Sequence, residues 1–93
     1  MNYIGFVYRW TNAIKGKMYV GSHAGPDNDG YIGSGLVFQH AIKKYGIENF
    51  TREILEYVSE GNLLNVEQKY LTKLDCANSE RYYNISPTAG GIS

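Results

Sequence analysis

The sequence has a single cysteine, Cys76, and only two prolines, and no apolar run approaches the roughly 18 residues of a membrane span. One cysteine cannot form an internal disulfide, and residues 1–5 lack the basic and apolar regions of a secretory signal. These absences exclude a disulfide-stapled scaffold and predict no membrane association. They favour a chain that works inside the cell, in a reducing cytoplasm.

Neither sign of charge is in excess, because nine Lys or Arg balance nine Asp or Glu. This balance argues against strong non-specific attraction to nucleic acid, which comes mainly from the neutralisation of phosphates. The charges are nevertheless unevenly placed. Residues 1–45 hold five Lys or Arg against two Asp, whereas residues 46–93 hold four against seven acidic residues. Only the first half is expected to face a polyanion.

Hydrophobic residues make up 43% of the chain and charged residues 19%, which is typical of a globular protein. Ninety-three residues allow one small domain with one core, so we expect residues 1–93 to form a single domain.

Three segments have the pattern of strands. Residues from Tyr3 to Trp10 alternate between two faces, and Met18–Gly21 follows after a polar, Gly-containing turn, so the two segments predict an antiparallel hairpin. Phe50–Val58 is rich in apolar and β-branched residues and predicts a third strand. The hairpin is apolar on both faces, which requires cover on both sides.

Two segments have the pattern of helices. Leu36–Tyr45 carries a buried stripe, with Ser34 as the expected N-cap and Gly46 as the end. A second helix is expected from Asn62, as its cap, to about Asp75. The residues between the hairpin and the first helix, 22–35, predict a long exposed loop, and residues 79–93 predict a mostly irregular tail.

Two tyrosines of the hairpin are expected to lie side by side. If Trp10 pairs with Lys17 across the turn, Tyr8 lies opposite Tyr19, and strand alternation places both rings on one face. One explanation is structural, because aromatic cross-strand pairs stabilise sheets. The other is that two adjacent phenols serve a chemical function.

Glu67 poses a second question. Helical periodicity places its carboxylate within the apolar stripe formed by Leu63, Tyr70 and Leu74. An unpaired buried charge is costly, so something should meet it. Either Glu67 lies at the rim and pairs with a Lys or Arg, or it binds a cation.

The combination of these features resembles the GIY-YIG nuclease domain, in its phage-type and homing-endonuclease branch. Phe6-Val7-Tyr8 and Met18-Tyr19-Val20-Gly21 resemble the paired motifs that name this family. Further likeness lies in "GYIGSG" at residues 30–35 and "AIKKYGIENF" at residues 41–50. The resemblance implies an α+β fold, a small three-stranded antiparallel sheet flanked by helices, which agrees with the expected order of elements.

The resemblance also implies roles for individual residues. Tyr8 and Tyr19 match the two motif tyrosines, Gly21 the motif glycine, and Asn12 a recurrent asparagine. Glu67 matches the metal-binding Glu helix, and Tyr83-Asn84-Ile85 matches a late "YN" motif, in which Asn84 is expected to brace the site by hydrogen bonds. Phe6 departs from the motif, which has Gly there.

A second departure concerns arginine. The family usually has a helix after the second motif that supplies an Arg and often a His, whereas residues 22–35 contain no Arg. The chain has only three arginines, Arg9, Arg52 and Arg81, and none fits that position. The transition-state cation must therefore come from elsewhere, or catalysis is weak.

The family mechanism is metal-dependent hydrolysis of DNA. Glu67 would hold Mg²⁺ or Mn²⁺, since one protein carboxylate with waters and substrate phosphate can suffice. Tyr8, with help from Tyr19, would take the proton of the attacking water. A phenol with an ordinary pKa of about 10 needs a cation or hydrogen-bond donors for this task.

His23, and His40 with Lys44 one helical turn later, are the suppliers that we favour for this charge, and Lys17 is a further one. Each has a structural alternative. For His23 the alternative is that it braces the Gly-rich loop, and for the helix residues that they form a solvated face. Asp27 and Asp29 in the loop form a weaker metal-site candidate than Glu67.

The sequence therefore predicts the catalytic domain of a DNA endonuclease acting on duplex DNA. A separate recognition domain or partner would supply affinity and sequence choice, and residues 86–93 would be a tail or the start of a linker. Two alternatives stay open: a catalytically silent DNA-binding or protein-interaction module on the same fold, and a nuclease directed at RNA.

Overall fold

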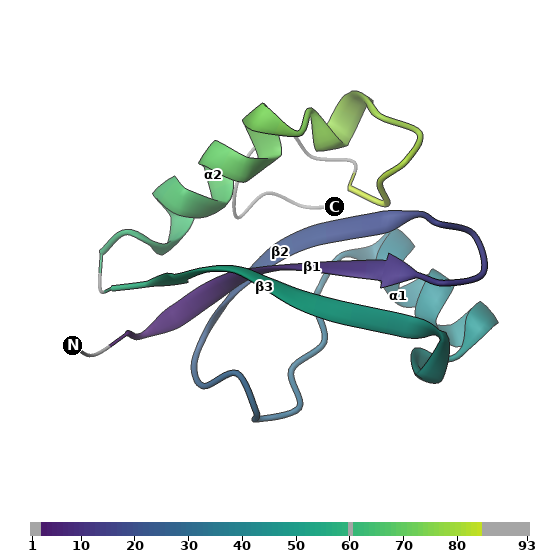
Figure 1. Cartoon of the computed structure of the whole chain (residues 1–93), viewed down its shortest axis with the longest axis horizontal. Helices are drawn as coiled ribbons and strands as arrows, with labels where there is room; N and C mark the ends of the chain where they lie inside the picture. Colours follow the sequence, from purple (N-terminus) through teal and green to yellow (C-terminus); the bar gives the residue numbers. More distant parts are fainter. Residues whose placement is uncertain (1–2, 60, 85–93) are drawn as a thin grey trace.

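The computed structural model describes residues 3–59 and 61–84. Their strands form one antiparallel sheet in the order β2-β1-β3, flanked by two helices, as Figure 1 shows. The elements are β1 (Gly5–Asn12), β2 (Met18–Ala24), α1 (Leu36–Tyr45), η1 (Ile47–Asn49), β3 (Phe50–Val58), α2 (Leu63–Lys73) and η2 (Cys76–Asn78). The expected α+β architecture is confirmed.

The sheet is covered on both faces, as its two-sided apolar pattern requires. Helix α1 packs on one face and α2 on the other (Figure 1). The core beneath α1 consists of Phe6, Tyr8, Tyr19, Phe38, Ala41, Phe50 and Tyr83. The core beneath α2 consists of Val7, Val20, Val58, Leu71, Cys76 and Tyr82. Successive residues of β1 and β2 thus divide between two cores, because side chains alternate along a strand.

The hairpin has a different register from the one expected. Trp10 pairs with Tyr19 and Tyr8 with Gly21, so the pairing of Trp10 with Lys17 was wrong. β1 continues to Asn12, whose backbone N–H donates to Lys17 O at 2.8 Å, and this closes the turn two residues later along β1. A shift of two residues preserves the alternation, so Tyr8 and Tyr19 still share a face.

The strand bounds also differ from the expected ones. β1 begins at Gly5 instead of Tyr3, and β2 continues through residues 22–24, which were expected to belong to the loop. Gly5 pairs with Ala24 and Val7 with Ser22, so this stretch gains regular hydrogen bonding from β1. Sequence patterning missed it because the stretch is polar and runs along the edge of the sheet.

The bounds of α1 are those expected, and Gly46, with a φ of 87°, ends it. The expected cap was wrong: Gly35 occupies the N-cap position, and no side chain caps the helix. Asn62 does occupy the N-cap of α2, but its side chain donates to Ser59 Oγ at 3.3 Å instead of to the helix.

The described part of the tail packs along β2. Met18 N–H donates to Arg81 O, and Tyr83 N–H donates to Met18 O, each at 2.7 Å. Residues 86–93, expected to be a tail or linker, lie outside the described residues. In the described part of the chain, no helix is long and apolar enough to cross a membrane.

Candidate active site

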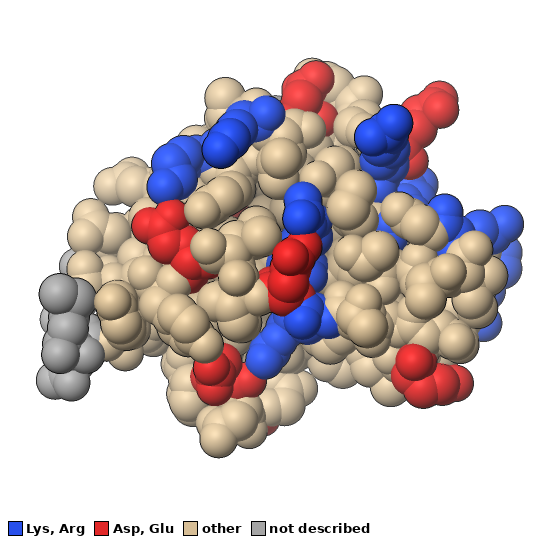
Figure 2. All heavy atoms as spheres, in the orientation of Figure 1, with Lys and Arg blue, Asp and Glu red and all other residues tan. Residues whose placement is uncertain are grey.

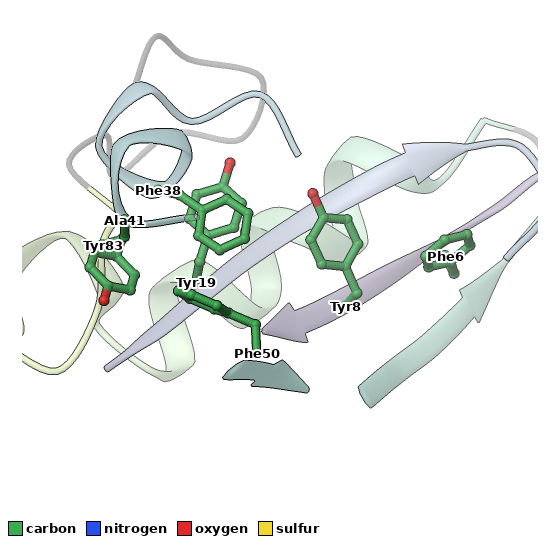
Figure 3. Packing of buried hydrophobic residues seen from close by; sticks show 7 residues of the cluster. All are labelled: Phe6, Tyr8, Tyr19, Phe38, Ala41, Phe50 and Tyr83. Carbon is green, nitrogen blue, oxygen red and sulfur yellow. The ribbon is translucent and has the colours of Figure 1, made fainter. Parts of the chain in front are cut away.

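Two phenols from the hairpin lie on the sheet face that α1 covers. Tyr8 comes from β1 and Tyr19 from β2, and their ring centroids lie 6.3 Å apart. Both side chains are buried, and Figure 3 shows their hydroxyls on the same side of the cluster. Gly21 pairs with Tyr8, and a Cβ atom built on Gly21 would stand 2.7 Å from Tyr8 Cζ. A residue without a side chain is therefore needed where the phenol passes over β2.

The surroundings of Tyr8 disfavour its ionised form. Burial raises the pKa of this phenol well above its ordinary range, and the neighbouring Tyr19, Tyr31 and Glu67 raise it further. A hydrogen bond with the Tyr31 side chain acts in the same direction. The Tyr8 hydroxyl therefore keeps its proton near neutrality, unless a positive charge is brought beside it.

Tyr19 is fixed by two contacts with the start of α1. Its ring stacks on Phe38, with centroids 4.3 Å apart and planes 4° from parallel. Its hydroxyl accepts a hydrogen bond from the Gly35 backbone N–H at 3.2 Å. The "GSG" stretch before the helix thus packs closely against this phenol. A Cβ on Gly35 would stand 2.6 Å from Tyr19 Cε1.

Glu67 reaches the edge strand from the opposite face. Strand alternation turns Ser22 of β2 toward α2, and the Ser22 hydroxyl donates a hydrogen bond to Glu67 Oε1. Glu67 is half-buried, and its negative charge contributes to the raised pKa of Tyr8. The carboxylate and the phenol therefore interact electrostatically although they come from elements on the two sides of the sheet.

The oxygen atoms around Glu67 suit a hard divalent cation. Within residues 3–59 and 61–84, no group of three or more His, Cys, Asp or Glu could hold a metal, which excludes a closed cage of protein ligands there. Mg²⁺ is commonly bound by one or two carboxylates, with waters and substrate phosphates completing its six positions. A half-buried carboxylate oriented by a hydroxyl meets that requirement, so the site fits such an ion.

His23 belongs to a small cluster beside Tyr8. Its Nε2 lies 2.6 Å from Asp29 Oδ2, and its ring stacks on Tyr31 with centroids 4.0 Å apart. Asp29 also accepts the Tyr31 backbone N–H at 3.0 Å. The hydrogen bond with His23 lowers the pKa of the Asp29 carboxyl most, and the one from the Tyr31 backbone lowers it further. His23 thus braces the loop and holds Tyr31 against Tyr8.

The other predicted suppliers of charge lie elsewhere. His40 and Lys44, on α1, line a separate groove together with Lys17, and neither phenol nor Glu67 lines it. The structure therefore gathers Tyr8, Tyr19, Gly21, Glu67 and His23 around β2, whereas His40 and Lys44 line the separate groove.

Two asparagines hold the surrounding backbone. Asn84 accepts the Val20 N–H at 3.0 Å and donates to Val20 O at 2.8 Å, so it pairs with the edge strand as a further strand residue would. Asn12 accepts the N–H groups of Ile14 and Lys15 in the turn and donates to the Tyr83 hydroxyl. Both side chains are buried and act through the backbone of the site.

The three arginines have structural surroundings of their own. Arg9 forms an ion pair with Glu53, and Arg52 donates to the backbone carbonyl of Asp27 at 2.5 Å. Arg81 lines the groove that contains His40.

The sequence analysis did not identify two residues of the site. Ser22 was assigned to the loop, and only its place in β2, facing α2, makes it a partner of Glu67. Tyr31 lies in an irregular segment, where the sequence has no periodic pattern that would indicate the direction of a side chain. The alternation of β2, had it been extended past Gly21, could have found Ser22.

Similar sequences occur among endonucleases of a bacteriophage. No family model matches the sequence. The chain is 47% identical over 89 residues to "Putative endonuclease segE" of Enterobacteria phage T4, which covers 94% of this chain and 42% of that protein. It is 36% identical over 81 residues to "Endonuclease segA" of the same phage, covering 86% of this chain and 37% of that protein.

A solved structure is similar over almost the whole chain. The fold matches a variant of the catalytic domain of intron endonuclease I-TevI with a TM-score of 0.65 and 18% sequence identity, covering 96% of this chain and 98% of that one. Because the identity is low, this likeness speaks to the fold. The chain spans about two fifths of the length of the curated phage relatives.

Proposed function

This chain belongs to the GIY-YIG endonuclease family, and we propose that it is the catalytic domain of a metal-dependent enzyme that hydrolyses phosphodiester bonds of duplex DNA. The observation that carries the proposal is that Tyr8, Tyr19 and Glu67, from three different elements, meet around Gly21 and Ser22 of the edge strand. The names of the phage relatives support an endonuclease.

Glu67 is assigned the binding of Mg²⁺ or Mn²⁺. When bound, such an ion polarises a scissile phosphate and stabilises the departing oxygen. Ser22 orients the carboxylate through its hydroxyl. Residues that hydrogen-bond to metal ligands commonly have this orienting role. Glu67 is the one described carboxylate for which both such a hydroxyl and an effect on Tyr8 are seen.

Tyr8 is assigned the orientation of the attacking water. Because burial and its neighbours raise its pKa, the phenol keeps its proton and holds the water by hydrogen bonding. Removing the water's proton directly would require a cation close enough to stabilise the phenolate. Tyr19 offers a second hydroxyl on the same face, and the cluster of His23 and Asp29 fixes Tyr31 against Tyr8.

The absence of the family Arg suggests slow hydrolysis. None of the described arginines is seen beside Tyr8 and Glu67, so less positive charge meets the transition state than in an enzyme with a positioned guanidinium.

Affinity for DNA and the choice of sequence would come from another segment or a partner. The length of the phage relatives, more than twice that of this chain, favours a further segment.

The test is nicking of supercoiled plasmid in Mg²⁺ or Mn²⁺. We expect the parent chain to nick and Glu67→Ala to lose nicking, while Glu48→Ala, which removes an exposed carboxylate on η1, retains it. Equal inactivity of parent and Glu67→Ala would overturn the proposal in favour of the silent binding module. Cleavage of an RNA duplex in preference to the matched DNA duplex would instead favour the RNA-directed nuclease.

A further inference from the structure

A positively charged groove lies at the turn end of the β1–β2 hairpin. Its volume is about 560 Å³, and it is bounded by the hairpin turn, α1 and the segment after η2. The basic and acidic side chains that line it are Lys15, Lys17, His40, Lys44, Glu80 and Arg81. Figure 2 shows Lys and Arg side chains gathered at this end of the molecule, over the hairpin turn.

The groove carries a concentrated excess of positive charge. Four cationic side chains face one carboxylate, that of Glu80, in a chain whose total charge is zero. Among residues 3–59 and 61–84, the ion pairs are Arg9–Glu53, Lys69–Glu56 and His23–Asp29, and none of them involves a groove residue. An excess of positive charge attracts an anion, and a cleft strengthens the attraction by focusing the field.

Two of the ammonium groups are held by aromatic rings. Lys17 Nζ lies 4.9 Å from the centroid of the Tyr83 ring, and Lys44 Nζ lies 5.3 Å from that of Tyr45. Tyr83 is itself fixed, because its hydroxyl accepts Asn12 Nδ2 at 3.1 Å. Restricted lysine side chains lose less conformational freedom when they bind an anion, which favours a built binding surface over a solvated helix face.

The groove lies at the start of β2, and the candidate active site lies around the middle of the same strand. Lys17 directly precedes β2, and Gly21, at the candidate active site, follows four residues later. At about 3.3 Å per residue the separation along the strand is roughly 13 Å. Duplex DNA rises about 3.4 Å per base pair, so this span corresponds to about four base pairs.

We propose that this groove binds the phosphate backbone of the DNA substrate, about four base pairs from the bond to be cut. The inference rests on the proposed function for its choice of polyanion. Lys15, Lys17, Lys44 and Arg81 make the phosphate contacts, and His40 borders them. The groove positions the duplex and carries no sequence information, because backbone contacts do not distinguish bases.

The test is binding of a fluorescently labelled DNA duplex in EDTA, where no cleavage occurs, at salt concentrations from about 50 to about 200 mM. Lys15→Gln/Lys44→Gln is compared with Lys69→Gln/Lys73→Gln on α2, which changes the net charge equally outside the groove. Each phosphate contact contributes about −0.9 to the slope of log K against log salt. The groove variant is expected to lose about two contacts, so its affinity varies roughly tenfold less over this range.

The outcomes separate this inference from the proposed function. Equal slopes for the groove and control variants, with plasmid nicking by the parent intact, overturn the groove and leave the nuclease standing. A groove-dependent slope without any nicking supports the groove and overturns the nuclease. If the double variant unfolds, as circular dichroism would report, the single variants Lys15→Gln and Lys44→Gln are each expected to reduce the slope by about 1.

Discussion

The contact between Ser22 and Glu67 joins β2 to α2 at the proposed metal ligand. A hydroxyl that donates to a carboxylate fixes the direction of its oxygen lone pairs without adding charge. Losing such an outer partner typically costs about 10- to 100-fold in metal affinity or activity. The role of Ser22 is therefore one of positioning, and it can be measured separately from folding.

We predict that Ser22→Ala raises the Mn²⁺ concentration needed for half-maximal nicking by about 10- to 100-fold, because the carboxylate loses its orienting donor. Ser22→Thr keeps the hydroxyl and is expected to restore most of the affinity. A change in nicking rate at saturating Mn²⁺, with the metal dependence unaltered and no rescue by Thr, would contradict a positioning role.

Cys76 provides a test of burial at the α2 side of the core. Burial raises the pKa of its thiol from 9.0 to about 11. The unfolded chain therefore ionises at lower pH than the folded chain, so the stabilisation is complete below pH 9 and is lost as pH rises toward 11.

We predict that the free energy of unfolding falls between pH 9 and pH 10, with a slope of up to about 1.4 kcal/mol per pH unit. Urea denaturation at several pH values measures it. Cys76→Ala is expected to be less stable below pH 9 and to flatten this slope, so that the two stabilities converge as pH rises. An equally steep slope in Cys76→Ala would mean that the thiol is not the titrating group.

At the scale of elements, β3 secures the loop that carries Tyr31. Arg52 donates to the Asp27 carbonyl, and the Tyr57 hydroxyl donates to Asp27 Oδ2 at 2.6 Å. The Arg52 guanidinium also lies over the ring of Phe6, with its Cζ 5.1 Å from the centroid. The third strand thus reaches the site through the loop, although it contributes none of the proposed catalytic groups.

We predict that Arg52→Ala destabilises the chain by about 1 to 3 kcal/mol, since it removes a charged hydrogen bond and a cation–π contact. Amide hydrogen exchange should become faster in residues 25–31, and nicking should decrease because Tyr31 is less well held against Tyr8. Lys73→Ala, on the exposed face of α2, serves as the control. Unchanged exchange in this loop would show that β3 does not secure it.

The elements themselves were largely predictable from the sequence, for physical reasons. Helix α1 and strand β3 have strong periodic patterns, and their bounds are the expected ones. The N-caps were predictable only in part: Asn62 occupies that of α2, whereas Gly35 and not Ser34 occupies that of α1. The hairpin register was wrong by two residues, since it depends on turn geometry that apolar alternation does not report.

At the scale of the whole molecule, charge and chemistry are divided along the edge strand. The candidate active site lies around Gly21 in the middle of β2, and the cationic groove lies just before the start of this strand. The sequence favoured the first half of the chain as the part that faces a polyanion, which stays a prediction, and the proposed groove also contains Arg81 of the second half. The sequence could not predict that Lys44 and His40 lie with Arg81, because that contact joins α1 to a segment far along the chain.

The same limitation applies to the site. The alternation and the family resemblance identified Tyr8, Tyr19 and Glu67, whereas the closeness of Glu67 to Tyr8 depends on how α2 crosses β2. A helix on one face of a sheet meets a phenol from the other face only at an edge strand. The position of β2 at the edge therefore decides whether the three groups can act together.

The most direct test of the account is a crystal structure of the chain with Mn²⁺, examined by anomalous scattering. We predict a signal in direct contact with the Glu67 carboxylate, on the side that faces the hydroxyls of Tyr8 and Tyr19. A signal at Asp27 or Asp29 instead, or none at Glu67 in crystals of a chain that nicks DNA, would contradict the assignment of the metal to this carboxylate.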